Sequence, residues 1–151
     1  MTALKSNGCY TVPAEVKDKV SALFYGGCCD DEGTKATIKK MFDESEYLCD
    51  THTAVAVNVY ENYVKETGDK TPSVVVSTAS PYKFSKSVLE AVESGSALPE
   101  NEFDMVDELN RVTSQPVPAP LSVLKDREVR FKNVIAADAM PEYVLKTLGI
   151  E

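Results

Sequence analysis

The stretch that decides the fold is Ser73-Val-Val-Val-Ser-Thr-Ala-Ser-Pro-Tyr-Lys-Phe84. It begins with a β-branched run that lacks polar alternation, which is typical of a strand buried on both faces, usually in a parallel sheet. Ser80 and Pro81 then predict the N-cap and the first turn of a helix. We therefore expect a strand, a short turn and a helix, with Val74–Val76 as the most buried segment of the chain.

Apolar residues at helical spacing predict helices on both sides of this stretch. The signals that mark these helices are Pro13 before the first, Thr34 as the cap of the second, Asp50 or Thr51 before a long helix that ends at Gly68, Met105 to Val112 in a short one, and Pro141 before the last. Residues 121–135 are ambiguous between helix and strand. The predicted fold class is α/β, helix-rich with few strands, and we expect residues outside this chain to complete the sheet.

Composition excludes several classes of protein. The chain has 151 residues and a net charge of −8, and its few arginines form no basic cluster, so we expect no nucleic-acid partner. At this length a single unit, residues 1–151, is predicted. The apolar runs are far shorter than a membrane span, and residues 1–8 lack the apolar core of a signal peptide. We expect a cytoplasmic protein with no membrane partner.

Cysteine and histidine limit the metal chemistry. Cys9, Cys28, Cys29 and Cys49 include no C-x-x-C pair, and His52 is the only histidine, so zinc motifs built on several histidines are excluded. We expect four reduced, partly buried thiols and no metal site. The sequence also contains neither a G-x-S-x-G elbow nor a glycine-rich phosphate loop.

The turn after the valines has two interpretations. Ligands of open α/β sheets bind beyond the carboxyl ends of the strands, so Ser77, Thr78 and Ser80 could lie at a ligand-binding edge. The same residues could instead form an ordinary polar connection in which Ser80 caps the next helix. Their spacing alone leaves both interpretations open.

Two motifs resemble a known family. Glu46-Tyr-Leu-Cys-Asp-Thr-His-Thr-Ala-Val-Ala56 resembles the Y-L-x-D-P-H-T-A-V-A segment of threonine synthases, with Thr51 in place of the usual proline. Ser77-Thr-Ala-Ser-Pro-Tyr-Lys-Phe84 resembles their S-T-A-x-P-x-K-F segment. The helix predicted just before Tyr47 also resembles this family, and the similar region runs from about Tyr10 to Gly149.

This resemblance implies the C-terminal portion of a pyridoxal-phosphate (PLP) enzyme of the tryptophan-synthase β type, fold type II. Threonine synthase is a lyase of threonine biosynthesis that converts O-phospho-L-homoserine and water to L-threonine and phosphate. The family's cofactor lysine and its phosphate-binding loop have no match in these 151 residues. The resemblance therefore implies that this chain works with the N-terminal part of the enzyme as its partner and has no activity alone.

The resemblance carries one cofactor-binding residue over to this chain. Thr78 matches the Ser or Thr whose hydroxyl hydrogen-bonds the pyridine nitrogen of the cofactor in this fold type. Ser77, Ser80 and Lys83 are expected to be structural. His52 and Thr53 could serve either helix capping or pocket lining, and no catalytic residue is assigned.

Two alternatives to threonine synthase remain. The chain could be a catalytically inert fragment of that enzyme, or it could belong to another fold-type-II lyase that acts on a phosphorylated or hydroxy amino acid. The sequence that precedes this region in the gene distinguishes a threonine synthase from an inert fragment. A substrate assay of the full-length enzyme distinguishes a threonine synthase from another fold-type-II lyase.

Overall fold

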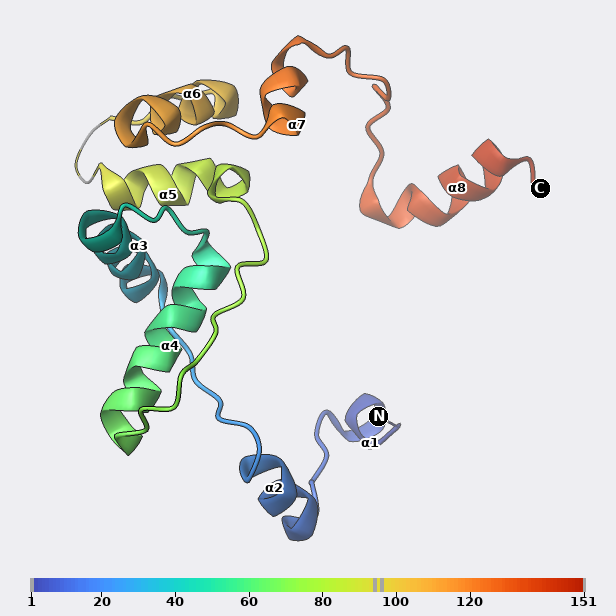
Figure 1. The fold of residues 1–151 in the computed structure, drawn as a ribbon. Helices are drawn as coiled ribbons and strands as arrows, with labels where there is room; N and C mark the ends of the chain where they lie inside the picture. The colour runs from blue at the N-terminus through green and yellow to red at the C-terminus, as the bar shows by residue number, and fades with distance from the viewer. Residues whose placement is uncertain (1, 94, 96, 151) are drawn as a thin grey trace. The chain divides into compact units, whose positions relative to one another are not determined.

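The computed structural model describes residues 2–93, 95 and 97–150, and within them the chain is helical without any strand (Figure 1). It divides into two compact units, residues 1–118 and 119–151. The helix-rich character that the sequence predicts is confirmed. The strand content is not.

The first unit is organised around four helices. These are α3 (Asp31–Ser45), α4 (Thr51–Thr67), α5 (Ser85–Val92) and α6 (Glu102–Thr113). Helix α3 packs against α4 and α5, and α5 packs against α6 (Figure 1). Ile38, Leu89 and Leu109 are fully buried at these contacts and form the centre of the core.

Helix ends in this unit follow from local side chains. Asp30, rather than the predicted Thr34, caps α3, because its carboxylate accepts the Gly33 amide hydrogen at 2.8 Å. Thr34 lies one turn inside the helix, where its hydroxyl donates to the Asp30 carbonyl. Of the two caps that the sequence allows for α4, Asp50 and Thr51, the structure uses Asp50, and Gly68 ends the helix with φ +70°, a backbone conformation that favours glycine.

The N-terminal helices of this unit bury nothing. They are α1 (Thr2–Asn7) and α2 (Ala14–Ser21), and α2 is the helix predicted after Pro13. Its apolar residues Val16 and Val20 are about half exposed.

After α2, the chain passes close to α4 at Gly27. A Cβ added at Gly27 would lie 2.7 Å from a methyl group of Val59.

The predicted buried strand at Ser73–Ser77 is wrong for this chain. The segment has no ladder partner within the described residues, and Val74 and Val76 are 89% and 70% exposed. The physical reason is that a strand is stabilised by hydrogen bonds from its neighbours, and the helices of this chain supply none. After it, the 3₁₀ helix η1 (Pro81–Phe84) leads directly into α5, as Ser80-Pro81 predicts.

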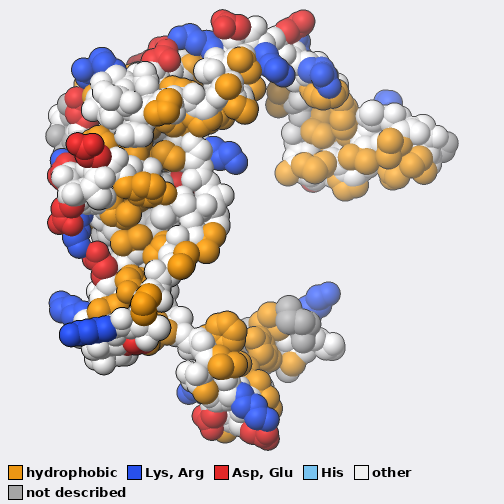
Figure 2. Space-filling view, viewed as in Figure 1, with side chains coloured by type: hydrophobic (Ala, Val, Ile, Leu, Met, Phe, Trp, Pro, Cys, Tyr) orange, Lys and Arg blue, Asp and Glu red, His pale blue; other side chains and the backbone are white. Residues whose placement is uncertain are grey.

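The second unit consists of short helices. They are α7 (Ala119–Ser122), the 3₁₀ helices η2 (Val123–Asp126) and η3 (Ala137–Ala139), and α8 (Met140–Leu148). None of these elements contains a buried residue. Hydrophobic side chains gather on the surface of α8, where Leu145 and Leu148 are 45% and 64% exposed (Figure 2). The ambiguous stretch 121–135 is thus helical at its start and irregular afterwards.

In the described part of the chain, each helix is too short or too polar to pass through a bilayer. All four cysteines are free, with Cys9 and Cys28 exposed, Cys29 half-buried and Cys49 buried. Burial raises the pKa of the Cys49 thiol to about 11, so it stays protonated and packs as a small apolar group.

Candidate functional site

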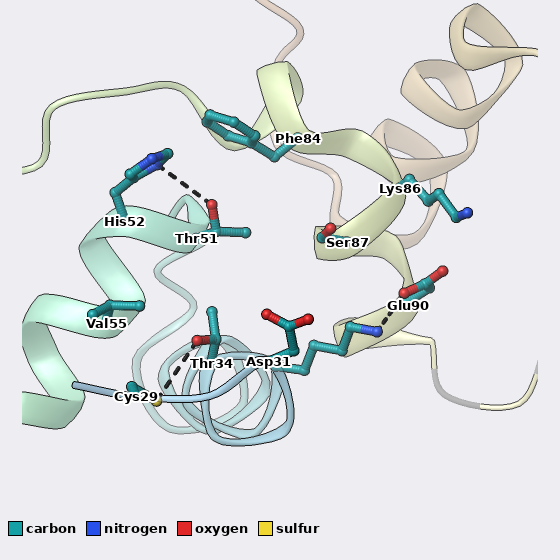
Figure 3. Close-up of a pocket in the computed structure, with 11 residues that line it drawn as sticks. Cys29, Asp31, Thr34, Thr51, His52, Val55, Phe84, Lys86, Ser87 and Glu90 are labelled. Atoms are coloured by element: carbon teal, nitrogen blue, oxygen red, sulfur yellow. Dashed lines mark hydrogen bonds and ion pairs between the residues drawn. The ribbon is translucent and has the colours of Figure 1, made fainter. Parts of the chain in front are cut away.

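A pocket of about 620 Å³ opens where the first turns of α3 and α4 face η1 and α5 (Figure 3). It is lined by Cys29, Asp31, Thr34, Lys35, Thr51, His52, Val55, Phe84, Lys86, Ser87 and Glu90. Charged side chains of both signs lie beside two aromatic rings, His52 and Phe84, and one valine. The pocket is therefore lined by both polar and apolar groups.

His52 is one wall of this pocket. Its ring lies 5.0 Å from the Phe84 ring, centroid to centroid, and Figure 3 shows both rings on the same side of the pocket. The side chain is 66% exposed, and its Nδ1 lies 3.2 Å from an Asp50 oxygen. Of the two roles left open by the sequence, pocket lining is the one that the structure gives His52, because Asp50 caps the helix.

Asp50 is a fully buried carboxylate at the start of α4. One of its oxygens accepts the backbone N–H groups of His52 at 2.9 Å and Thr53 at 3.4 Å, and the other accepts the Thr53 hydroxyl. Burial alone raises the pKa of this carboxyl, but these hydrogen bonds outweigh burial and lower the pKa below its ordinary value. The group is therefore ionised at neutral pH.

The predicted cofactor residue, Thr78, lies outside the pocket. It is exposed, in the irregular segment between α4 and η1, and it is not among the lining residues. Its neighbour Ser77 approaches the Thr53 hydroxyl at 3.3 Å, while Ser80 caps η1 by accepting the Tyr82 amide hydrogen at 3.3 Å. Lys83 is exposed. The structural roles of Ser77 and Ser80 are observed, and the cofactor role of Thr78 stays a prediction.

The lysines of the pocket face acidic partners. Lys35 donates to Glu90 at 2.5 Å, and this hydrogen bond raises the pKa of Lys35. Lys86 lies close enough to Glu90 to lower the pKa of that carboxyl, although the bond from Lys35 lowers it more. The ion pair with Glu90 therefore favours the protonated form of Lys35. No cluster of three or more His, Cys, Asp or Glu side chains that could hold a metal occurs in the part of the chain described.

Sequence reasoning missed the link between Asp50, Thr53 and Ser77. The sequence predicts Asp50 or Thr51 as the helix cap and leaves Thr53 open between capping and pocket lining, and nothing in it joins these residues to Ser77. Asp50 is the N-cap of α4 and Thr53 is the third residue of the helix, the two positions that pair in a capping box, although the residue types differ from that motif. The contact with Ser77, twenty-four residues later, appears only when the chain is folded.

The family model "Threonine synthase, C-terminal" matches residues 53–144 of this chain. The matched region contains Thr53, Ser77 and Thr78, and it covers more than half of the sequence. The chain belongs to the threonine synthase family. This finding confirms the resemblance seen in the two sequence motifs.

Individual threonine synthases agree with this membership. The enzyme of Saccharomyces cerevisiae is 30% identical over 116 residues, which are 74% of this chain and 23% of the yeast protein. The threonine synthase of Pseudomonas aeruginosa is 29% identical over 117 residues, 77% of this chain and 24% of the bacterial protein. Human threonine synthase-like 2 is 32% identical over 80 residues, 53% of this chain and 16% of that protein. The chain thus spans about a quarter or less of the length of these relatives.

Proposed function

We propose that this chain forms the C-terminal part of a PLP-dependent threonine synthase, a lyase that converts O-phospho-L-homoserine and water to L-threonine and phosphate. The observation that carries the proposal is the family match over residues 53–144. Both compact units would belong to this one part of the enzyme, and the free cysteines favour a cytoplasmic location.

The residues present suit one edge of the cofactor. Thr78 offers an exposed neutral hydroxyl, which can hydrogen-bond a pyridine nitrogen without fixing it as a pyridinium. A carboxylate there would instead favour the protonated ring. The family's Schiff-base lysine motif and phosphate-binding loop have no match in this sequence. They would come from the N-terminal part of the enzyme.

In the complete enzyme, PLP would supply the electron sink for the reaction at the amino acid. This chain would contribute binding and orientation. Thr78 would hold the ring nitrogen and so fix the tilt of the ring. The exposed valines of the preceding segment, Val74 and Val76, would lie against the sheet of the N-terminal part.

The assay that tests the reaction uses the full-length enzyme and the isolated chain side by side. The full-length enzyme should release equal amounts of L-threonine and phosphate from O-phospho-L-homoserine. The isolated chain with added PLP should release neither. Turnover of a different phosphorylated or hydroxy amino acid in preference to O-phospho-L-homoserine would instead identify another fold-type-II lyase.

The test of Thr78 is the substitution Thr78→Val in the full-length enzyme. It keeps the shape and removes the hydroxyl, so PLP binding should weaken by about 1–3 kcal/mol, and the absorption spectrum of the bound cofactor should shift. Ser80→Ala is the matched control, because it also removes one hydroxyl from this segment but from the cap of η1. Equal PLP affinity and equal spectra for Thr78→Val and the parent enzyme would remove Thr78 from the site.

A further inference from the structure

Hydrogen bonds hold the segment that carries Thr78 against α4 at two places. It leaves the C-terminal end of α4, runs back along the helix and enters η1 near the start of α4 (Figure 1). At the first place, Asp69 accepts hydrogen bonds from the hydroxyl and amide of Thr71 and from the Tyr63 hydroxyl at 2.7 Å. At the second, Ser77 meets Thr53 in the first turn of α4.

The contact between Ser77 and Thr53 depends on the buried carboxylate of Asp50. Thr53 is 3% exposed and Asp50 is completely buried, so water does not compete for the hydrogen bond between them. An ionised carboxylate only accepts hydrogen bonds. The single hydroxyl hydrogen of Thr53 is therefore directed at Asp50, and the oxygen of that hydroxyl is left to accept.

This direction decides how Ser77 is held. The Ser77 and Thr53 oxygens lie 3.3 Å apart, and either hydroxyl could donate on distance alone. Because the Thr53 hydrogen points to Asp50, Ser77 is the donor. The chain of hydrogen bonds then runs from Ser77 to Thr53 to Asp50, and each hydroxyl has one preferred orientation.

We propose that Thr53 and Asp50 are positioning residues for Thr78, which act by holding Ser77 and thereby the backbone that presents the Thr78 hydroxyl to the cofactor nitrogen. The inference rests on the proposed function of Thr78. Thr78 is the residue after Ser77, it is exposed, and its segment has no ladder partner within the described residues. Its position therefore depends on the bonds that its neighbours make.

A structural reading of the same residues is that Asp50 and Thr53 serve only the start of α4. The two readings differ in what happens at Thr78. Loss of a helix cap alone frays the first turn of α4. Loss of a positioning bond also frees the backbone around Thr78.

The first experiment measures the order of the Thr78 backbone amide by ¹⁵N relaxation in the 151-residue chain. Thr53→Val, which keeps the shape of the side chain, should raise the mobility of Ser77, Thr78 and Ala79. Thr53→Ser keeps the hydroxyl and should restore their order. Thr113→Val is the matched control: Thr113 is also buried and hydroxyl-bonded, but it lies at the end of α6.

The second experiment measures PLP affinity and the cofactor spectrum in the full-length enzyme. Thr53→Val should weaken PLP binding by roughly 2- to 10-fold, the effect of one hydrogen bond, and shift the spectrum in the same direction as Thr78→Val. Thr53→Ser should return both to parental values, and Thr113→Val should leave both unchanged.

The outcomes separate this inference from the proposed function. If Thr53→Val mobilises Thr78 no more than Thr113→Val does, the positioning role is overturned whatever Thr78 does. If Thr78→Val changes the cofactor but Thr53→Val does not, Thr78 keeps its role and the inference fails. If Thr78→Val itself changes nothing, the proposed role of Thr78 fails, and the positioning role fails with it.

Discussion

Apolar residues are buried in the helices α3 to α6 but largely exposed in the connector, residues 69–80. In the helices, Ile38, Val88, Leu89 and Leu109 are fully buried where α5 packs against α3 and α6. In the connector, Val74 and Val76 are largely exposed, although valine is as apolar as those residues. Both regions carry a strong sequence pattern, but only the helices find the surface that their pattern requires within the chain.

The difference shows what each kind of element needs. An α-helix satisfies its backbone hydrogen bonds internally, so a layer of helices becomes self-sufficient once the apolar faces meet. A strand satisfies its backbone groups only through neighbouring strands. The helical core of this chain can therefore form without further strands, whereas the β-branched segment stays unpaired. Substitutions of buried residues in the helices should lower the free energy of unfolding more than substitutions in the connector.

The largest effect is expected in the helical core, for Leu89→Ala. Leu89 is fully buried in α5, which packs against both α3 and α6. The substitution should lower the free energy of unfolding by about 2–5 kcal/mol, because it removes apolar contacts and leaves a cavity. Urea denaturation of the 151-residue chain measures it. Leu148→Ala on the exposed face of α8 is the control, and an equal loss for both would contradict the burial of Leu89.

A smaller effect is expected for Asp50→Asn, where the helical core meets the connector. The carboxylate accepts several hydrogen bonds, and bonds to a charged acceptor are stronger, so the substitution should cost about 1–2 kcal/mol at neutral pH. Because the folded pKa of Asp50 is lowered, its contribution is present above the ordinary pKa of about 3.9 and is lost as the pH falls through the folded value.

The measurement for Asp50 is urea denaturation at a series of pH values. The parent chain should lose its advantage over Asp50→Asn as the solution becomes acidic. The other carboxyls are unchanged by the substitution, among them Asp69, whose pKa is lowered to about 2 mainly by the Thr71 hydroxyl. They are common to both proteins and cancel in the difference. A difference that is constant with pH would show that Asp50 acts by shape alone.

The helical part of the fold could be predicted from the sequence because its signals are local. Asp50 and Gly68 mark the ends of α4, and Ser80-Pro81 marks the start of η1. The sequence predicts the cap of α3 at Thr34, whereas the cap is Asp30, because several cap-forming side chains lie close together there. Local competition of this kind shifts a boundary but leaves the helix in place.

The site was less predictable because it depends on contacts between distant residues. The pocket unites α3, α4 and α5, and no motif announces that Lys35 will pair with Glu90. The sequence also predicts that the valine run is buried, whereas Val74 and Val76 are exposed in the structure. The β-branched pattern predicts a strand, which needs neighbouring strands to pair with, and the described residues contain no such strand.

The smallest effect in the isolated chain is expected for the connector, in Val74→Thr and Val76→Thr. Both side chains are exposed, so each substitution should change the free energy of unfolding of the 151-residue chain by less than about 0.5 kcal/mol. Val75 lies between them and is half-buried, so Val75→Thr should cost more than either neighbour. Thermal and urea unfolding of the three variants measure this pattern.

The same substitutions in the full-length enzyme make the comparison decisive. If the connector becomes a strand buried on both faces there, each new hydroxyl enters an apolar layer and costs about 1–3 kcal/mol unless it finds a partner. Val74→Thr and Val76→Thr should then change from neutral to destabilising, and Val75→Thr should no longer stand apart. If each variant changes the free energy of unfolding by the same amount in the full-length enzyme as in the 151-residue chain, the N-terminal part does not cover this segment. The β-branched run would then need another explanation than a shared sheet.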